Sequence, residues 1–416
     1  MTNEMLEKIR ASIRHAMEGG AFYAQRFAGI NADDIRTEED FRKLPFTDKG
    51  DLRGAYPLGL QAGPDSEIVR IHSSSGTTGT PVIIPYTAQD VTDWAIMFER
   101  CYRVAGITNL DRIQVTPGYG LWTAGIGFQT GAERLGAMVI PMGPGNTEKQ
   151  LRMMVDLKST VLCATSSYAL LLAEEIERRG IKDQIHLKKG VIGSERWGEK
   201  MRRRIANELG VQLYDIYGLT EIYGPGIAIS CDYEDGMHYW DDYVYCEVID
   251  PKTGENVADG TMGELVITTL TKQGIPLVRY RTRDITSLNY TPCSCGRTHV
   301  RMNRITGRSD DMLIIRGVNV FPSQIESLLL EVQGVSPHYQ LILTRENNLD
   351  YVEVQVELDG AMFSDAIKDL QQREQRIQKG IKEFLGVTTK VRLVEPHSIP
   401  RSEGKAVRVI DRRVMQ

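Results

Sequence analysis

The stretch TVLCATSSYALLLAEEIERRG, residues 160–180, joins a short apolar run to an amphipathic run with helical spacing. The same alternation continues on both sides of it. Helix-like runs begin at Thr147 and Glu199, and short apolar runs cover 188–195 and 211–218. Short apolar segments separated by amphipathic helices are typical of βαβ units on a parallel sheet. We therefore predict an α/β fold whose ligands bind in loops beyond the carboxyl ends of the strands.

The last hundred residues have a different pattern. YVEVQVEL, residues 351–358, alternates Val352, Val354 and Val356 with polar residues, as a strand does. A helix should follow, with apolar side chains at Phe363, Ile367, Leu370, Ile377, Ile381 and Phe384, and then a strand at TKVRLVEP. We predict a large N-terminal domain, 1–309, with mostly parallel sheets flanked by helices, and a small mobile α+β domain, 310–416.

Composition excludes several classes of protein. The chain has 416 residues, 41% of them apolar, and a net charge of −5, which gives no general attraction for nucleic acid or an anionic membrane. We expect no secretory leader and no membrane span, because the start lacks a basic and an apolar segment and no run of about 18 apolar residues occurs. Six scattered cysteines do not indicate a disulfide scaffold. We expect a cytoplasmic protein.

IHSSSGTTGTPVIIPYT, residues 71–87, gathers hydroxyl side chains around two glycines. A Walker-type phosphate loop is excluded, because Thr80 and Pro81 stand where its lysine would be needed. Glycines nevertheless let successive backbone N–H groups face one concavity, and hydroxyls add neutral donors. The loop is therefore either a phosphate cradle or an ordinary solvated loop.

Two further segments carry groups that suit a nucleotide. YGLTE, residues 217–221, supplies a ring for stacking on a base, a hydroxyl for a phosphate and a carboxylate for Mg²⁺. PLVRYRTRD ends at Asp284, a carboxylate suited to two ribose hydroxyls. Structural alternatives remain for each residue: Tyr217 as a core residue at a strand end, and Asp284 as a helix or turn cap.

Five motifs occur in the same order as in the acyl-adenylate-forming enzymes, which the chain therefore resembles. They are SSSGTTGTP, YGLTE, YRTRD, GRSDD…RGVNVFP and SEGKAVRV. Within that superfamily the chain is most similar to phenylacetate–CoA ligases, from about Asp48 to the C-terminus. The resemblance implies an ATP-dependent acid–thiol ligase. A carboxylate, most simply phenylacetate, attacks the α-phosphorus of ATP to give acyl-AMP and pyrophosphate. The thiol of coenzyme A then takes the acyl group and releases AMP.

The resemblance also implies residue roles. Lys405 is the catalytic cation, because an ammonium can contact the carboxylate and the α-phosphate together; without the resemblance it would be an ordinary surface lysine. Thr220 and Glu221 complete the catalytic set, with Mg²⁺ on Glu221. Asp310 is the hinge of the C-terminal domain. The nucleotide and coenzyme A residues are Ser73, Ser74, Ser75, Gly76, Thr77, Thr78, Gly79, Gly193, Ser194, Glu195, Asp215, Tyr217, Gly218, Asp284, Arg308, Arg316 and Gly317.

GYGLWTAGIGF, residues 118–128, alternates glycine with large aromatic side chains. Glycines such as Gly125 and Gly218 admit a flat ligand close to the backbone, and Tyr119, Trp122 and Phe128 could form an apolar wall. This arrangement suits an aryl-acetic acid. The alternative is a glycine-rich turn whose aromatic side chains belong to the ordinary core.

Four residues form a complete set of ligands for structural Zn²⁺. Cys231 and His238 stand in CDYEDGMH, and Cys293 and Cys295 stand in PCSCGRTH, with His299 as a reserve ligand. Cysteines 101, 163 and 246 have the sequence surroundings of buried apolar residues.

Two other functions remain open at this stage. One is a stand-alone adenylating enzyme that loads the pantetheine of a carrier protein. The other is a catalytically silent nucleotide sensor. A homodimer is consistent with the family.

Overall fold

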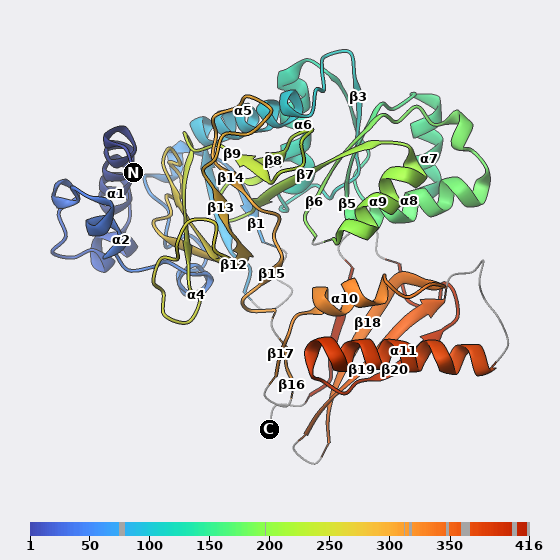
Figure 1. The fold of residues 1–416 in the computed structure, drawn as a ribbon. Coiled ribbons are helices and arrows are strands. Elements are labelled where there is room, and N and C mark those ends of the chain that lie inside the picture. The colour runs from blue at the N-terminus through green and yellow to red at the C-terminus, as the bar shows by residue number, and fades with distance from the viewer. Residues whose placement is uncertain are drawn as a thin grey trace. The chain divides into compact units, whose positions relative to one another are not determined.

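The computed structural model describes residues 1–74, 80–195, 197–311, 313–315, 318–346, 349–358, 367–401 and 406–413 (Figure 1). The chain divides into two compact units. The first comprises Met1–Ala164, Asp183–Ser194 and Gln212–Ile305, and the second comprises Thr165–Lys182, Glu195–Val211 and Thr306–Gln416. No helix in the described part of the chain is both long enough and apolar enough to cross a membrane.

A nine-stranded sheet forms the centre of the first unit, with the order β13-β14-β9-β8-β7-β6-β5-β3-β4. Its strands are β3 Arg112–Val115, β4 Met138–Pro141, β5 Val161–Thr165, β6 Lys189–Gly193, β7 Gln212–Leu219, β8 Gly224–Ser230, β9 Met237–Tyr239, β13 Leu288–Asn289 and β14 Arg301–Met302. The pairs β6–β7, β3–β5 and β3–β4 are parallel, whereas β7–β8, β8–β9, β9–β14 and β13–β14 are antiparallel. The change of direction occurs at β7, which carries the YGLTE motif at its carboxyl end.

The predicted alternation of helices and strands is confirmed. The helices between the strands are α6 Ala124–Leu135, α7 Thr147–Asp156, α8 Ser166–Arg179 and α9 Glu199–Leu209. Helix α8 begins where the Thr165 hydroxyl accepts a hydrogen bond from the backbone N–H of Tyr168, and it ends at Gly180, whose φ is 62°. These local signals explain why the boundaries can be predicted from the sequence. The α/β fold class is confirmed.

The remaining elements of the first unit are α1 Asn3–Gly19, α2 Ala21–Arg26, α3 Glu38–Arg42, α4 Lys49–Gly54, β1 Ile68–Ser73, β2 Ile83–Thr87 and α5 Ala88–Val104, followed later by β10 Val244–Ile249, β11 Gly263–Thr269 and β12 Tyr280–Thr286. Among them, α1, α2 and α4 lie together beyond one end of the nine-stranded sheet, and α5 runs along it (Figure 1). Strands β1 and β2 form an antiparallel pair, and β10, β11 and β12 are neighbours in a second sheet. The aromatic residues Trp94, Phe98, Tyr102 and Phe128 are fully buried in the common core.

A buried ion pair joins the second sheet to the N-terminal segment. Arg279 and Glu247 are almost fully buried, and two hydrogen bonds of 3.1 Å connect the guanidinium to the carboxylate. Arg279 Nη1 also donates to the carbonyl oxygen of Leu44 at 2.7 Å. Burial raises the pKa of Glu247, while Arg279 favours its charged form.

Substitution of this arginine should destabilise the protein strongly. Arg279→Met leaves the Glu247 carboxylate buried without its partner, and we expect a loss of about 3 kcal/mol in the free energy of unfolding. Urea denaturation measures it. The double variant Arg279→Met with Glu247→Gln should recover part of the loss. A single variant as stable as the wild type would contradict the role given to the pair.

The C-terminal part of the second unit has its own core. Its elements are β15 Gly307–Arg308, β16 Leu313–Ile315, β17 Val318–Val320, α10 Pro322–Leu329, β18 Val335–Glu346, β19 Leu349–Leu358, α11 Ile367–Leu385, β20 Lys390–Val394 and β21 Val409–Asp411. The sheet order is β20-β19-β18-β21. Val352, Val354 and Val356 are buried as predicted, and they pack in one cluster with Ile377 and Ile381 of α11.

One apolar residue at the predicted helical spacing does not lie in the core. Phe384 is 64% exposed, whereas Leu385 is buried. Positions 377, 381 and 385 are four residues apart and therefore lie on one helical face, which leaves position 384 at the side of it. Phe363 lies outside the described residues.

Candidate active site

The base of the serine- and threonine-rich loop is held at both ends. The backbone N–H of Ser73, the last residue of β1, donates to the carbonyl oxygen of Leu121 at 2.8 Å. Ser74 N–H donates to the Val82 carbonyl oxygen at 3.0 Å, and Val82 N–H donates to the Ser74 hydroxyl oxygen at 3.1 Å. The bonds between Ser74 and Val82 hold the two ends of the loop together. Ser75, Gly76, Thr77, Thr78 and Gly79 lie outside the described residues.

Two predicted nucleotide residues meet in the first unit. The Tyr217 hydroxyl donates to Asp284 Oδ2 at 2.7 Å, although the two residues are 67 positions apart in the chain. Tyr217 lies on β7 and Asp284 on β12, and both are at least nine-tenths buried. The bond fixes the phenol ring and the carboxylate relative to each other. The structure thus brings these two residues together, and their contacts with the base and the ribose stay predictions.

The predicted catalytic residues follow β7. The hydroxyl oxygens of Thr220 and Thr123 are 3.1 Å apart, and both side chains are buried. Glu221 is 5% exposed, and its Oε1 lies 3.0 Å from Nζ of Lys49 at the start of α4. The carboxylate proposed for Mg²⁺ therefore already faces one cation. A role for Glu221 as a ligand of Mg²⁺ stays a prediction.

Close backbone contacts explain two of the predicted glycines. A Cβ atom at Gly193 would lie 2.4 Å from the carbonyl oxygen of Ile216, and one at Gly218 would lie 2.0 Å from that of Gly224. Any side chain at either position would therefore require the paired strands to separate. Asp215, also on β7, pairs with Arg304, whose Nε lies 2.8 Å from Oδ2 of the carboxylate. Its role in nucleotide binding stays a prediction.

Glu195 has different neighbours from those expected beside adenine. Its carboxylate accepts hydrogen bonds from the Ser166 hydroxyl at 3.1 Å, from the Ser167 N–H at 2.9 Å and from the Ser167 hydroxyl at 3.0 Å. It also accepts from the backbone N–H of Ala406 at 2.6 Å. Ser194, which precedes it, has a φ of 69°. A contact of Glu195 with adenine stays a prediction.

The residues predicted for the hinge and for coenzyme A are described only in part. Arg308 binds the Asp310 carboxylate through Nε at 2.8 Å and Nη2 at 2.9 Å. The residue proposed to contact the ribose, Arg308, is thus paired with the proposed hinge residue, Asp310. Arg316, Gly317 and the catalytic candidate Lys405 lie outside the described residues.

The predicted acyl-binding residues are not all equivalent. Tyr119 and Trp122 are partly exposed, and a Cβ atom at Gly125 would lie 2.7 Å from the Tyr119 ring. The Tyr119 hydroxyl is buried without a hydrogen-bond partner among the described residues. Phe128 is 1% exposed and packs on Phe98 with ring centroids 4.8 Å apart. Tyr119 and Trp122 are therefore better placed than Phe128 to contact a ligand.

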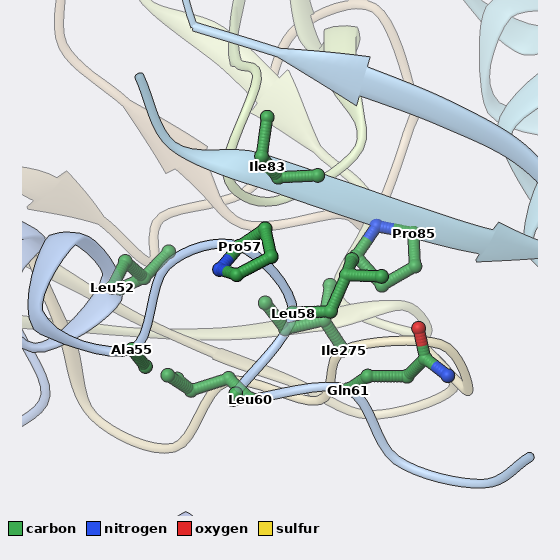
Figure 2. Close-up of a pocket in the computed structure, with 10 residues that line it drawn as sticks. Leu52, Ala55, Pro57, Leu58, Leu60, Gln61, Ile83, Pro85 and Ile275 are labelled. Atoms are coloured by element: carbon green, nitrogen blue, oxygen red, sulfur yellow. The ribbon is translucent and has the colours of Figure 1, made fainter. Parts of the chain in front are cut away.

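A small apolar hollow lies elsewhere in the first unit (Figure 2). Its lining consists of Leu52, Ala55, residues 57–61, Ile275, and Ile83 and Pro85 of β2. Its lining contains none of the predicted nucleotide or acyl residues. The hollow is therefore a packing feature beside β2.

The predicted metal ligands come together. Atoms of Cys231, His238, Cys293 and Cys295 that can bind a metal all lie within 4.8 Å of one another. The sulfurs of Cys231 and Cys293 are 3.7 Å apart, and Cys295 Sγ is 3.3 Å from His238 Nε2. Zinc–sulfur bonds of ~2.3 Å in a tetrahedron separate two sulfurs by about 3.8 Å. The spacing fits Zn²⁺.

Neighbouring groups orient the imidazole of this set. His238 Nδ1 lies 3.4 Å from the backbone oxygen of His299, which leaves Nε2 directed at the thiol. Burial lowers the pKa of His238 and so favours the neutral ring that a metal requires. His299 is engaged through its own Nδ1 with Asp241 at 2.7 Å. His299 thus belongs to a separate group with Asp241 and Asp242, and its use as a reserve ligand stays a prediction.

Comparison with known proteins identifies the family. The model of the AMP-binding enzyme family matches residues 31–271, and that of the AMP-binding enzyme C-terminal domain matches residues 317–413. The chain belongs to the AMP-binding enzyme family. The predicted membership of the acyl-adenylate-forming enzymes is confirmed. The predicted activity, that of an ATP-dependent, AMP-forming acid–thiol ligase, is confirmed as well.

This AMP-binding enzyme has relatives over nearly its whole length. It is 46% identical to the phenylacetate-coenzyme A ligase of Pseudomonas putida, over 100% of this chain and 94% of that protein. It is also 46% identical to that of Escherichia coli (strain K12), over 98% and 94%. A crystal structure of 2-hydroxyisobutyryl-CoA ligase in complex with 2-HIB-AMP matches with a TM-score of 0.90 and 29% identity, over 98% of this chain and 88% of that one.

Sequence reasoning missed several residues that this AMP-binding enzyme places against the predicted site. Lys49 pairs with Glu221, Thr123 with Thr220 and Arg304 with Asp215. No local pattern distinguishes these residues from ordinary surface or core residues. Their partners lie far away in the chain, so only the fold brings them together.

Proposed function

We propose that the AMP-binding enzyme activates an aryl-acetic acid, with phenylacetate as the preferred substrate, and transfers the acyl group to free coenzyme A. The bond between Tyr217 and Asp284 carries the nucleotide part of this proposal. Four curated phenylacetate-coenzyme A ligases at 43–46% identity support the choice of acid. The partly exposed rings of Tyr119 and Trp122 supply the flat apolar surface that a phenyl group needs.

One assay tests the activity and the substrate together. Labelled pyrophosphate should exchange into ATP only when an accepted carboxylic acid is present. Across a panel of aryl, indole and fatty acids, phenylacetate should give the highest kcat/KM. A preference of tenfold or more for a fatty acid would contradict the proposed substrate, and no exchange with any acid would favour the nucleotide sensor.

Within the catalytic cycle, the residues divide the work between two domains. Residues 1–309 are proposed as the adenylation domain and 310–416 as a lid that turns at Asp310. Thr220 would contact the α-phosphate, Ser73–Gly79 the outer phosphates, and Arg308 the ribose beside Asp284. Glu221 would hold Mg²⁺, which offsets the charge that develops on the phosphates. Lys405 would bring the substrate carboxylate to the α-phosphorus, and Arg316 and Gly317 would lie along the path of the pantetheine.

Free coenzyme A is preferred over a carrier protein as the acceptor because the relatives at 43–46% identity are phenylacetate-coenzyme A ligases. Assaying thioester formation with coenzyme A and with a pantetheinylated carrier protein, at equal concentrations, distinguishes the two acceptors. Faster loading of the carrier would overturn the choice.

A structural Zn²⁺ is proposed at Cys231, His238, Cys293 and Cys295. Three thiolates and one imidazole complete a tetrahedron, so the metal has no open position for substrate. The set joins β9 and the segment before β14 to the loop after β8, and it would stabilise that end of the sheet.

Purified protein should therefore contain about one equivalent of zinc per chain. Elemental analysis after purification without chelators measures it. Cys293→Ser should lose the metal and lower the unfolding temperature, while Cys246→Ser, at a buried cysteine outside the set, should keep it. Well under half an equivalent in the wild type would contradict the metal site.

The cytoplasm is the proposed compartment, because ATP and coenzyme A are available there and free thiols stay reduced. A homodimer is proposed from the family resemblance alone. Light scattering during size-exclusion chromatography tests it, and a mass of one chain at micromolar concentration would contradict it.

A further inference from the structure

Lys272 carries a buried amine with no evident role in the reaction described above. It lies between β11 and β12, and its side chain is 1% exposed. Among the described residues, Nζ has no hydrogen-bond partner. Nζ lies 3.6 Å from the ring centroid of Tyr86 and 4.3 Å from that of Tyr223. Removing an ammonium from water is costly, and cation–π contacts offset only part of that cost. Folding stability alone therefore does not explain a lysine here.

The two rings belong to the two segments that surround the proposed triphosphate. Tyr86 lies on β2, the strand that follows the serine- and threonine-rich loop. Tyr223 stands two residues after Glu221. The Tyr86 hydroxyl donates to the carbonyl oxygen of Tyr223 at 3.0 Å, and the Tyr223 hydroxyl lies 3.0 Å from Oγ1 of Thr271. Lys272 is thus between a phosphate-loop strand and a catalytic segment, in contact with both.

Neighbouring elements hold the lysine in this position. Asp90 of α5 is fully buried, and its carboxylate accepts from the backbone N–H of Gln273 at 2.7 Å and of Gly274 at 2.8 Å. The same carboxylate accepts from the N–H of Thr87 at 3.0 Å, at the end of β2. The backbone that follows Lys272 is therefore fixed to the strand that carries Tyr86.

The charged and titratable groups that face the amine are Asp90 and Asp93 of α5, His72 of β1, Tyr86 and Tyr223. Burial lowers the pKa of Lys272 to about 8, and the two aspartates act in the opposite direction. Burial also lowers the pKa of His72, whose ring meets that of Tyr86 edge-on at 5.2 Å. At neutral pH the Lys272 amine is therefore mostly protonated, and it is the cation that faces the rings of Tyr86 and Tyr223.

We propose that Lys272 is a positioning residue for ATP, which holds the strand after the phosphate loop against the segment that carries Thr220 and Glu221. It acts through Tyr86 and Tyr223 and does not touch the substrate. The inference rests on the proposed roles of those two segments in binding the triphosphate.

Kinetics of Lys272→Met provide the test. Methionine keeps the length of the side chain and removes its charge. The KM for ATP should rise about tenfold, as expected when two cation–π contacts are lost. The KM for the acid should stay within about twofold, since its proposed contacts lie on other segments. The unfolding temperature should be unchanged or higher, because a buried charge has been removed.

Tyr86 provides a matched pair of variants. Tyr86→Leu removes the ring face and should raise the KM for ATP as Lys272→Met does. Tyr86→Phe keeps the ring face and removes only the hydroxyl, so its KM for ATP should lie closer to that of the wild type.

The wild-type pH dependence supplies a second readout that does not depend on any variant folding. As pH rises through about 8, the amine loses its proton, and the KM for ATP should increase. Lys272→Met should lack this step. The unfolded lysine keeps its proton to higher pH, so the contribution of Lys272 to the free energy of unfolding should increase over the same range. ATP affinity and this stability contribution should therefore change in opposite directions.

Two results would overturn the inference. One is an unchanged KM for ATP in both Lys272→Met and Tyr86→Leu, with no pH step in the wild type. The other is a joint loss of ATP affinity, acid affinity and thermal stability, which is the result of a general structural role. Absence of acid-dependent pyrophosphate exchange in the wild type would instead contradict the proposed function.

Discussion

Lys405→Ala should lower the rate of acyl-AMP formation by about 10³-fold, while thioester formation from supplied acyl-AMP continues. Two anions, the substrate carboxylate and the α-phosphate, must approach each other in the first half-reaction, and their repulsion has to be offset by a cation. In the second half-reaction the thiol loses its proton and attacks the acyl carbon of the mixed anhydride, and AMP leaves as the bond between the acyl carbon and the phosphate oxygen breaks. No carboxylate has to approach phosphorus in this step, so this cation is not required. Single-turnover measurements of the two half-reactions separate them.

Lys405→Arg is the matched control, because it keeps the charge but replaces a compact ammonium with a planar fork. It should recover only part of the first half-reaction. Lys390→Ala, on β20 of the same unit, should leave both half-reactions near their wild-type rates, since that lysine pairs with Glu353. Equal loss of both half-reactions in Lys405→Ala would refute the division of labour.

Glu221→Ala should also reduce acyl-AMP formation strongly, by about 10³-fold at low Mg²⁺, which corresponds to the several kcal/mol that a bound metal ion supplies. The buried carboxylate is the proposed protein ligand of the metal, and without it Mg²⁺ would be held by the nucleotide alone. Raising the Mg²⁺ concentration should restore part of the activity. Titration of the rate with Mg²⁺ measures the effect.

Lys49 provides a second test of Mg²⁺ binding by Glu221. In the structure its ammonium lies 3.0 Å from the Glu221 carboxylate, so it would compete with a metal ion held there for that oxygen. Lys49→Met should therefore lower the Mg²⁺ concentration that gives half-maximal rate, in the opposite direction to Glu221→Ala. A Mg²⁺ dependence that is unchanged in Glu221→Ala would exclude this residue as the metal ligand.

The sequence predicts the parts of the molecule that depend on local signals. The helix boundaries around α8 follow from Thr165 and Gly180, and the strand at 349–358 follows from its alternating valines. The four proposed metal ligands also come together as expected, because three cysteines and a histidine in two short segments are a chemically distinctive set.

Contacts between distant segments could not be predicted in this way. Nothing near Lys49 indicates that it will meet Glu221, and nothing near Lys272 indicates two tyrosine rings. Phe384 shows the same limit on a smaller scale. Its helix was predicted correctly. Neighbouring positions on a helix face different directions, however, so Leu385 is buried whereas Phe384 is exposed.

The 2.0 Å separation at Gly218 has a consequence for anyone who wishes to change the acids that this ligase accepts. Even a methyl group there would collide with main-chain atoms of the adjoining strand, which no repacking of side chains can relieve. Libraries that randomise position 218 should therefore yield mostly unfolded or inactive protein. Trp122, a proposed acyl-binding residue, offers a more tolerant starting point, since it is only partly buried and its truncation should admit acids with larger rings.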